Sequence, residues 1–405
     1  MSDIKITKVS AIQTNPLGGG NSNLIVVRID TNQPGLYGYG CATYTQRHKA
    51  VVTAIEEYMD QLLVGRDALN INDAWSVMMN SSYWRNGPVL NNAISGCDMA
   101  LWDIAGRAAN QPVWQLWGGK VRPAVPVYRH ASGEDFGRLD EMVARYLEEG
   151  YQYIRIQRGA YGGAHAWLKT PKGAQDGAYF DPKKYLREVP GTFEHVRVKF
   201  GDDIELLHDV HERLMPVDAV WLARQLEKYR PFFLEDALAP EDGFWFKTIR
   251  ESCATPIAMG ELFNNPMEWQ PLIENRWIDY IRCHISQIGG VTPARKLAAY
   301  CEPFGVKTAW HGPGDVSPVG HMANVHLDLT TVNFGIQEWC GMETDPRVRE
   351  VFDGCAEIRD GFAWANDKPG WGIEVDLGKA KKYPCDSAQP RWLLARLPDG
   401  TSVKA

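Results

Sequence analysis

The sequence predicts an α/β fold in which a (β/α)-barrel of eight strands follows a smaller α+β domain. The first observation is the texture of the chain after residue 120, where short apolar runs alternate with amphipathic stretches, as expected of repeated βα units. The second is length, because about 27 residues per unit suits a closed barrel of ~250 residues. The third is that no Gly-rich phosphate turn follows the first strand of this region, which argues against an open doubly wound sheet.

The composition indicates a folded protein without an extended basic surface. The chain has 405 residues, of which 44% are hydrophobic and 23% are charged, and this length accommodates a large barrel with an accessory domain. The formal net charge of -7 and the lack of Lys/Arg clusters argue against a nucleic-acid partner. Eight cysteines without a Cys-x-x-Cys pair indicate reduced thiols in the core.

The N-terminus has no pattern typical of a targeting or membrane segment. The stretch Met1–Val9 alternates polar and apolar residues and lacks both the basic and the apolar region of a signal peptide. No uncharged apolar run in the chain approaches the length of a membrane span. We therefore expect a cytoplasmic protein without a membrane partner.

The first 120 residues predict a small sheet followed by helices. One strand is predicted at Asn23–Ile29, after the Gly-rich turn Gly18–Gly20. A second strand is predicted at Leu36–Cys41, after the turn pair Pro34-Gly35. Helical apolar spacing follows in three segments, which are Lys49–Val64, Ile71–Met79 and Asn91–Ala109. This order indicates an α+β domain.

Eight short apolar runs are predicted as the barrel strands. They are Val125–Tyr128, Tyr153–Gln157, Glu205–Asp209, Phe232–Glu235, Ile257–Glu261, Tyr280–His284, Val306–His311 and Gly335–Glu338. Helices are predicted between them, for example at Leu139–Glu149, Val217–Tyr229 and Pro293–Tyr300. The segment Gly159–Pro182 is too long for a plain connection, so we expect an active-site loop there. Beyond Gly370 the chain is expected to return to the first domain.

Three predicted strands end in an acidic residue, at Asp209, Glu235 and Glu261. Because twenty-six residues separate each acid from the next, the three side chains fall on neighbouring strands at the C-terminal rim, where barrel active sites lie. Close carboxylates repel one another unless a cation lies among them, and three oxygen ligands suit Mg²⁺ better than Zn²⁺. The alternative is that each acid only caps the helix that follows it.

Several motifs resemble those of a known enzyme superfamily. The block Ala93–Gly119, which contains Cys97–Ile104 and ends in Leu-Trp-Gly-Gly, resembles the end of the capping domain of the enolase superfamily. More narrowly, His208–Leu214 and His311–Asp315 resemble the mannonate dehydratase group, which is also called the D-galactonate dehydratase family. The resemblance covers nearly the whole chain.

The resemblance implies a fold and a cofactor. The fold is a (β/α)7β-type TIM barrel at residues 121–370, with an N-terminal α+β capping domain at residues 1–120 that residues from about 371 to 405 complete. The cofactor is Mg²⁺, with Asp209, Glu235 and Glu261 as its ligands. This fits the chemistry, since proton removal next to a carboxylate creates negative charge that a bound cation stabilises.

The general acid implied by the resemblance is His211. This residue lies two positions beyond Asp209 and therefore at the same rim. The reference pKa of histidine, ~6.5, suits proton transfer at neutral pH. The alternative for a single histidine is a structural hydrogen bond.

The general base has a less direct sequence signal. Many superfamily members place Lys-x-Lys at the end of the second barrel strand, but this chain has Arg155–Arg158 without a lysine. By resemblance, Arg155 activates a tyrosine, and Tyr161 is the nearest candidate. Tyr179 and Tyr185 are the other tyrosines near this loop, and Tyr161 could instead be an aromatic that covers the barrel mouth.

A further set of residues is expected to contact the substrate, by resemblance and by position at strand ends or in the capping domain. They are Asn23, Gln46, His130, Arg282, His311, Asp315 and Glu338. In other members, a residue at the place of His311 pairs with an Asp on strand six, where this chain has Arg282-Cys283-His284. A racemase needs a base on each face of the substrate carbon that loses its proton, so this difference argues against racemase chemistry. His284 is interpreted as structural.

Two features depart from the active mannonate dehydratases. Pro313 stands where they tend to have Ala, and relatives with Pro at this position have low or undetected activity on sugar acids. Those enzymes also end in a Trp close to the active site, whereas this chain ends in Ser402–Ala405.

These observations lead to one preferred function and two alternatives. The preferred function is dehydration of a C6 aldonate such as D-gluconate, D-mannonate or D-galactonate to a 2-keto-3-deoxy acid. The second hypothesis is a divergent family member without detectable sugar-acid dehydratase activity and with an unknown or regulatory role. The third is a racemase, epimerase or cycloisomerase, which the missing lysines disfavour. By analogy with other barrel enzymes we expect a homo-oligomer.

Overall fold

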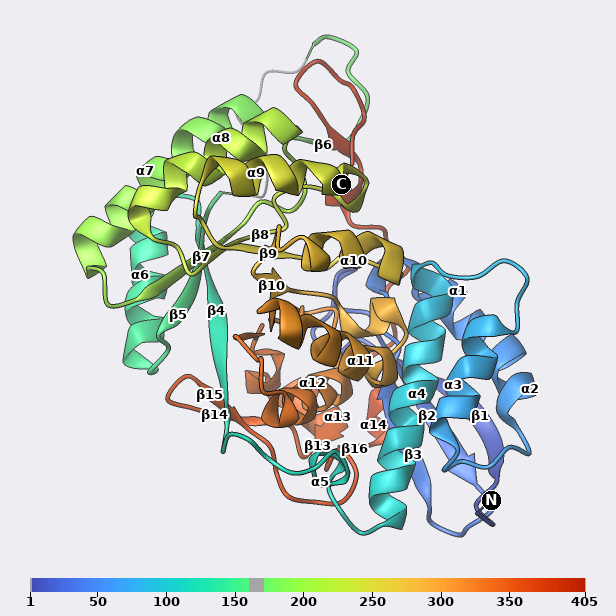
Figure 1. Cartoon of the computed structure of the whole chain (residues 1–405). Coiled ribbons are helices and arrows are strands. Elements are labelled where there is room, and N and C mark those ends of the chain that lie inside the picture. Colours follow the sequence, from blue (N-terminus) through green and yellow to red (C-terminus); the bar gives the residue numbers. More distant parts are fainter. Residues whose placement is uncertain (1, 160–170, 405) are drawn as a thin grey trace.

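The structure is a computed structural model that describes residues 2–159 and 171–404. A (β/α)-barrel and a smaller domain pack side by side (Figure 1). The predicted barrel with an N-terminal α+β domain is therefore confirmed. Within the two described ranges, no helix combines the length and the apolar character that crossing a membrane requires.

The capping domain is built on a three-stranded antiparallel sheet. Its strands, in order across the sheet, are β1 (Ile6–Thr14), β2 (Leu24–Thr31) and β3 (Tyr37–Cys41). The second and third coincide with the two predicted strands, whereas β1 is absent from the prediction. Its fully buried residues Ile6, Val9 and Thr14 do not alternate with period two, and its register shifts between Ile6 and Lys8, so the usual strand signal is missing.

The helices of the capping domain lie against this sheet. They are α1 (His48–Thr53), the π-helical η2 (Ala54–Met59), α2 (Asp60–Leu63), α3 (Ile71–Asn80) and α4 (Pro88–Ala108). The predicted helix Lys49–Val64 is therefore three consecutive helical segments. Helix α4 packs directly on β3. The contact is so close that a Cβ atom added to Gly40 would lie 2.0 Å from the Gly96 carbonyl oxygen. This close contact requires glycine.

Eight parallel strands form the barrel, at the eight predicted places. They are β4 (Val125–Gly133), β5 (Tyr153–Arg158), β7 (Glu205–Asp209), β8 (Phe233–Glu235), β9 (Ile257–Met259), β10 (Tyr280–Ile281), β11 (Lys307–Thr308) and β12 (Gln337–Glu338). Seven of them pair in the order β11-β10-β9-β8-β7-β5-β4, and β12 pairs with β4. A bridge between Phe334, just before β12, and Thr308 of β11 closes the barrel.

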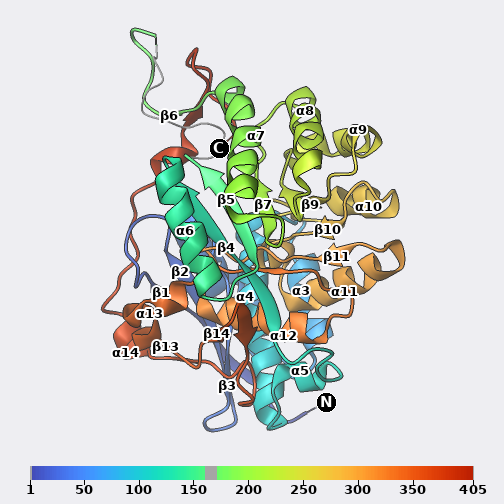
Figure 2. The same cartoon turned by 90° about the vertical axis from the view of Figure 1, so that its left-hand side faces the viewer.

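The barrel helices surround these strands. They are α6 (Phe136–Glu148), α7 (Pro182–Phe200), α8 (Pro216–Leu226), α9 (Phe246–Ser252), α10 (Pro266–Glu274), α11 (Val291–Cys301) and α12 (Pro318–Thr330), and the short α5 (Val113–Leu116) precedes β4. Figure 2 shows α6 and α7 outside β4 and β5. A separate cluster of Tyr128, Leu207, Phe233, Ala258, Ala309 and Ile336 fills the interior of the barrel. The barrel is therefore a packed core that can hold polar groups at its rim.

Several barrel strands are shorter than predicted. The ladder of β10 contains Tyr280 and Ile281, whereas the predicted strand continued to His284. Beyond the ladder the chain leaves the sheet and continues to the rim without strand pairing, and this part carries Arg282 and His284. The positions of the rim residues were therefore predicted better than the extent of the ladders.

The chain after β12 runs through short helices and strands, and parts of it contact the capping domain. It forms α13 (Pro346–Val351), β13 (Phe352–Asp353), β14 (Glu357–Arg359), β15 (Phe362–Trp364), β16 (Glu374–Val375), α14 (Leu377–Ala380) and β17 (Ala395–Arg396). Glu374 accepts hydrogen bonds from Arg107 at 2.6 Å and from Tyr37 at 2.9 Å. Farther on, the backbone of Asp386 is held by the side chain of Asn23.

The end of the chain also pairs with the long loop that follows β5. Strand β17 is parallel to β6 (Ala178–Tyr179), and Figure 1 shows the green and red segments side by side above the barrel. The guanidinium of Arg391 donates to the Asp176 carboxylate at 2.9 Å. The last twenty residues therefore bridge the capping domain and the loop at the barrel mouth.

The contact between capping domain and barrel centres on one buried carboxylate. Asp98 of α4 accepts hydrogen bonds from the backbone N–H of Thr292 at 2.9 Å and from its hydroxyl at 2.5 Å. The neighbouring Gly290 has φ +108°, and a Cβ atom there would lie 2.4 Å from Asp98 Oδ2. The fixed position of α4 over the barrel thus depends on a glycine at residue 290.

We predict that Gly290→Ala lowers the free energy of unfolding by about 3 kcal/mol, because it combines a left-handed backbone with a clash against Asp98. Denaturant unfolding measures this change. Gly191→Ala is the control, since its added methyl meets no atom within 4 Å in α7 and alanine favours the helix by up to ~1 kcal/mol. Equal unfolding midpoints for the two variants would contradict the prediction.

Candidate active site

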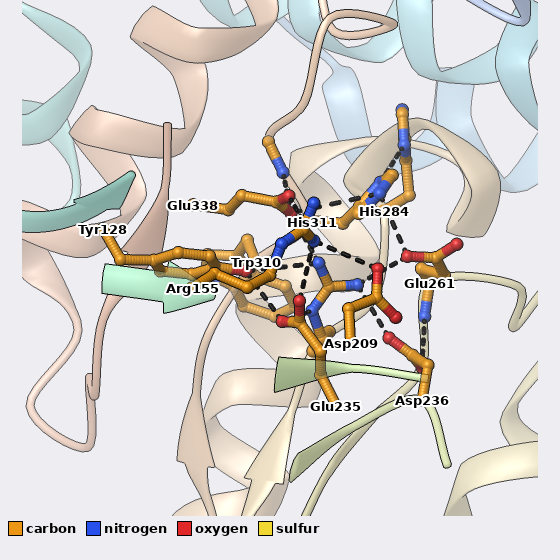
Figure 3. A network of polar contacts seen from close by, with 12 residues as sticks. Tyr128, Arg155, Asp209, Glu235, Asp236, Glu261, His284, Trp310, His311 and Glu338 are labelled. Carbon is orange, nitrogen blue, oxygen red and sulfur yellow. Dashed lines mark hydrogen bonds and ion pairs between the residues drawn. The ribbon is translucent and has the colours of Figure 1, made fainter. Parts of the chain in front are cut away.

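The three acids at the strand ends come together at the C-terminal rim of the barrel (Figure 3). Asp209 at the end of β7 lies opposite Glu235 at the end of β8 in the strand register, and Glu261 follows β9 by two residues. Their side chains are buried, with exposures of 1%, 0% and 8% respectively. We call Asp209, Glu235 and Glu261 the acid triad.

Two buried arginines bridge the acid triad. Arg155 of β5 places Nη1 2.7 Å from Glu235 Oε1 and 3.1 Å from Asp209 Oδ2. Arg282 places Nε 3.0 Å from Glu235 Oε2, and its Nη1 lies 2.7 Å from Glu261 Oε2. Each arginine therefore holds two of the three acids, and Glu235 is common to both.

Carboxylates outnumber guanidinium groups at this rim. The buried acids around the triad are Asp209, Glu212, Glu235, Asp236, Glu261 and Glu338. Burial and the charge of Glu235 raise the pKa of Asp209 well above its usual value. Burial and the charge of Glu261 do the same to the pKa of Glu212, whose two carboxylate oxygens have no hydrogen-bond partner among the described residues.

This excess of negative charge fits a divalent cation. The donor atoms are carboxylate oxygens, which are the ligands that Mg²⁺ prefers. The two arginines leave at least one buried acid without a partner within the described part of the chain, so a further cation would remove like-charge repulsion. The acid triad is therefore suited to hold a hard divalent ion.

A strained turn brings His211 to the same rim. His211 and Glu212 have φ angles of +58° and +54°, in the left-handed region that non-glycine residues seldom adopt. The backbone N–H of His211 donates to Asp209 Oδ1 at 2.7 Å, and its Nε2 lies 3.8 Å from Glu261 Oε1. Burial lowers the pKa of His211 to about 4, although Glu261 opposes this shift.

His311 enters the site from the chain that follows β11. Its Nε2 lies 3.1 Å from Glu261 Oε2. Burial opposes the charged imidazole, but Glu261 and Glu338 outweigh it and raise the pKa of His311 to about 9. Its Nδ1 lies 2.8 Å from Nδ1 of His284, which was expected to be structural but faces the pocket.

The loop from His311 to Asp315 is held from below. The backbone N–H of Gly312 donates to Glu338 Oε2 at 3.0 Å, and its carbonyl oxygen lies 3.1 Å from Nε2 of His321. The Nδ1 atom of His321 contacts Glu343 at 2.5 Å. Two acceptors on one imidazole require both nitrogens to carry protons, which agrees with the raised pKa of His321.

A cavity of about 720 Å³ opens above the acid triad. Eight of the predicted site residues line it, and they are Gln46, Arg155, Asp209, His211, Glu261, His311, Asp315 and Glu338. The capping domain, the barrel rim and the C-terminal segment all contribute to its wall. The volume is typical of a small-molecule site.

Four predicted residues are not among those that line the cavity. Glu235 and Arg282 lie beneath it, both with 0% exposure, and His130 contacts Glu338 and Arg155. The side chain of Asn23 contacts Asn15, His48 and Asp386, and its neighbours Asn21 and Ser22 line the cavity instead.

The predicted base Tyr161 lies outside the described residues, so its role stays a prediction. Of the alternatives, Tyr185 of α7 contacts His208 at 2.7 Å on the outer side of β7. The Tyr179 hydroxyl donates to the Gln175 carbonyl at 2.7 Å. Neither tyrosine is among the residues that line the cavity.

Trp392 is a cavity residue that the sequence reasoning missed. It lies in η9 (Arg391–Leu393), and its ring meets the imidazole of His211 edge to face with centroids 5.8 Å apart. Its indole N–H donates to Asn21 Oδ1 at 3.1 Å. The chain ends in Ser402–Ala405, without the terminal Trp of the active mannonate dehydratases, but Trp392 lies at the cavity. The pairing of β17 with β6 places Trp392, and no local sequence signal predicts that pairing.

Comparison with known proteins identifies the family. The protein-family model described as "Mandelate racemase / muconate lactonizing enzyme, N-terminal domain" matches residues 6–118. A second family model, described as "Enolase C-terminal domain-like", matches residues 138–380. The chain therefore belongs to the enolase superfamily, as its motifs predicted.

Individual relatives identify the family within the superfamily to which the chain belongs. It is 53% identical to a D-galactonate dehydratase family member of Salmonella virchow (strain SL491), over 100% of both chains. A member from Enterocloster bolteae is 52% identical, again over 100% of both. The chain thus belongs to the D-galactonate dehydratase family.

Two solved structures share the fold. An enolase from Pantoea ananatis, with bound D-gluconate and Mg, is 50% identical and superposes with a TM-score of 0.96 over 100% of both chains. A putative dehydratase from Zymomonas mobilis ZM4 is 25% identical and superposes with a TM-score of 0.83, over 94% of this chain and 98% of the other.

We predict that Mg²⁺ stabilises the folded protein through the acid triad. At a free concentration of about 100 times Kd the gain should be about 2.7 kcal/mol, because only the folded chain assembles the site. Asp209→Asn should lose most of this gain in thermal unfolding with and without Mg²⁺. Asp140→Asn changes a buried acid on α6, far from the triad in sequence, and should keep the gain. Equal Mg²⁺ shifts in both variants would argue against the assigned ligands.

Proposed function

We propose that this protein is a Mg²⁺-dependent acid-sugar dehydratase that converts a C6 aldonate into a 2-keto-3-deoxy acid. The observation that carries the proposal is the group of buried acids at the barrel rim, with His211 turned back over it beside a cavity. D-Gluconate is the first substrate to test, because the solved relative from Pantoea ananatis holds D-gluconate and Mg. D-Mannonate and D-galactonate belong to the same class.

The acid triad would hold the cation. When bound, Mg²⁺ supplies positive charge that stabilises the oxyanion formed from the substrate carboxylate. Arg155 and Arg282 both contact Glu235, at 2.7 Å and 3.0 Å, and fix its carboxylate from below. The two arginines therefore orient the ligands and need not contact the sugar acid themselves.

The reaction removes one proton and one hydroxyl group from neighbouring carbons. A base takes the proton next to the carboxylate, and by resemblance this base is Tyr161 assisted by Arg155. The electron pair forms a carbon–carbon double bond while the bond to the β-hydroxyl breaks. His211 in its protonated form delivers a proton to this hydroxyl, so water leaves. The enol then gains a proton at the β-carbon and loses its hydroxyl proton, which gives the 2-keto acid.

The polar groups around the cavity suit a sugar acid. The Glu261 and Glu338 carboxylates raise the pKa of His311, and its imidazole faces the cavity, so it is placed to bind an anionic or hydroxyl oxygen. Gln46, Asp315 and Glu338 offer acceptors and donors for hydroxyl groups on the cavity wall. A mostly polar ligand of C6 size is compatible with a cavity of about 720 Å³.

Racemase or epimerase chemistry has less support. Such reactions need a base on each face of the carbon that loses its proton. The end of β5 carries Arg155 and Gln157 and no lysine, and the residue that contacts His311 Nδ1 is His284 and not an aspartate. Elimination needs a base on one face and an acid for the leaving group, and the position of His211 at the rim supports the second of these roles.

A divergent member with an unknown or regulatory role is the second candidate. It is favoured by Pro313, which lines the cavity beside His311 where active mannonate dehydratases tend to have Ala. Such a protein would bind Mg²⁺ and a sugar acid without forming product. Product detection therefore separates the two candidates.

We predict that the purified protein with Mg²⁺ forms a 2-keto-3-deoxy acid from at least one C6 aldonate, which a semicarbazide assay detects. His211→Asn should lower the rate by at least about 10²-fold, because it removes the acid for the leaving hydroxyl. His195→Asn, a partly exposed histidine on α7, is the matched control. If no product forms from D-gluconate, D-mannonate or D-galactonate although Mg²⁺ is bound, the divergent family member would be favoured.

We also predict that Trp392→Ala lowers kcat/KM about tenfold, equivalent to about 1.4 kcal/mol, because it opens the cavity wall beside His211. Trp392→Phe should retain most of the activity, since an aromatic face remains. Steady-state kinetics on the best aldonate measures both, and Trp221→Ala controls for loss of a partly exposed tryptophan elsewhere. An unchanged kcat/KM for Trp392→Ala would remove this residue from the site.

A further inference from the structure

Three side chains beside the acid triad form a separate group of metal-binding type. They are His284, after β10, and His311 and Asp315, after β11. One ligand atom from each lies within 4.8 Å of the other two. Among the described residues, it is the one group of three or more His, Cys, Asp or Glu side chains whose ligand atoms all lie this close together.

We propose that His284, His311 and Asp315 form a second cation site, which takes a nitrogen-preferring divalent metal such as Zn²⁺. Two imidazoles and one carboxylate match the ligands that Zn²⁺ favours, whereas Mg²⁺ prefers oxygen alone. The rim therefore carries two kinds of site side by side, one of oxygens and one of mixed nitrogen and oxygen. This inference goes beyond the proposed dehydratase activity and does not require it.

The contact between the two histidines is the first support. Their Nδ1 atoms lie 2.8 Å apart. Figure 3 shows the two labelled side chains next to each other. Such a contact is attractive when a proton lies between the two lone pairs, and a metal ion can take the place of that proton. Bonds of about 2.1 Å reach both nitrogens with small ring rotations.

An unsatisfied buried atom is the second support. The Oδ1 atom of Asp315 is buried and has no hydrogen-bond partner among the described residues. The neighbouring His284 side chain is 2% exposed. All three side chains line the cavity of about 720 Å³, so an ion can reach them from the barrel mouth. Buried polar atoms of this kind normally find a partner, and a bound cation would supply it.

The surrounding contacts leave His311 free to bind in this way. Its other nitrogen, Nε2, faces Glu261 at 3.1 Å and Glu338 at 3.9 Å. The Glu261 carboxylate accepts from Nε2, and this contact directs Nδ1 toward His284. A carboxylate behind a ligating imidazole is the usual arrangement in zinc sites.

Occupation of this site has a consequence for the proposed function. Zn²⁺ would withdraw His311 and Asp315 from the sugar acid, so it would inhibit turnover even when Mg²⁺ fills the acid triad. That consequence rests on the proposed function, whereas binding of Zn²⁺ does not. The two claims can therefore fail independently.

The test is calorimetric titration of Zn²⁺ into the full-length protein in the presence of saturating Mg²⁺. We expect one Zn²⁺ site in the wild type and an affinity at least about tenfold weaker in His284→Asn. Asp315→Asn should weaken binding similarly, so a folding defect in one variant does not decide the result. His195→Asn is the matched control, because His195 also lies next to a carboxylate, 2.9 Å from Asp140.

Unchanged Zn²⁺ affinity in both His284→Asn and Asp315→Asn would overturn the inference. Loss of all Zn²⁺ binding when Mg²⁺ is added would also overturn it, since zinc would then occupy the acid triad. Weaker binding in His195→Asn instead would overturn it as well, because it would assign the ion to the pair of His195 and Asp140. An inactive protein that still binds Zn²⁺ through His284 would contradict the dehydratase proposal and leave this inference standing.

Discussion

Six buried carboxylates gather at the C-terminal rim of the barrel, and two buried guanidinium groups lie among them. Buried like charges are costly unless cations balance them, so this concentration of acids constrains everything around it. Arg155 and Arg282 balance part of the charge by bridging Asp209, Glu235 and Glu261 in pairs. The remaining excess, most evident at Glu212, is what makes the rim suited to a divalent ion.

The fold serves this arrangement at several levels. The parallel strands bring acids that are distant in sequence to one rim, and an apolar cluster with Tyr128 and Phe233 supports them from inside the barrel. Helix α4 fixes the capping domain through Asp98, and the C-terminal segment closes the cavity with Trp392. The backbone is strained at His211, where a left-handed turn directs the imidazole back over the acid triad.

The sequence predicted the features that follow from the βα repeat. It did not predict side chains whose positions depend on contacts between distant segments. The spacing of Asp209, Glu235 and Glu261 follows the βα repeat, so their convergence at one rim could be derived from it. Strand β1 was missed because its buried residues do not alternate. Trp392 reaches the cavity only through the pairing of β17 with β6, and the inward position of His284 depends on where its chain leaves the ladder of β10. No local pattern encodes either placement.

Anomalous diffraction from crystals in which Mn²⁺ replaces Mg²⁺, with D-gluconate present, would locate the cation directly. Mn²⁺ prefers the same oxygen ligands and gives a distinct signal. We expect a strong peak within bonding distance of Asp209, Glu235 and Glu261, with density for the sugar acid beside it under His211 and Trp392. No peak at these three carboxylates, with Arg155 and Arg282 still holding them, would contradict the claim that the acid triad binds a cation.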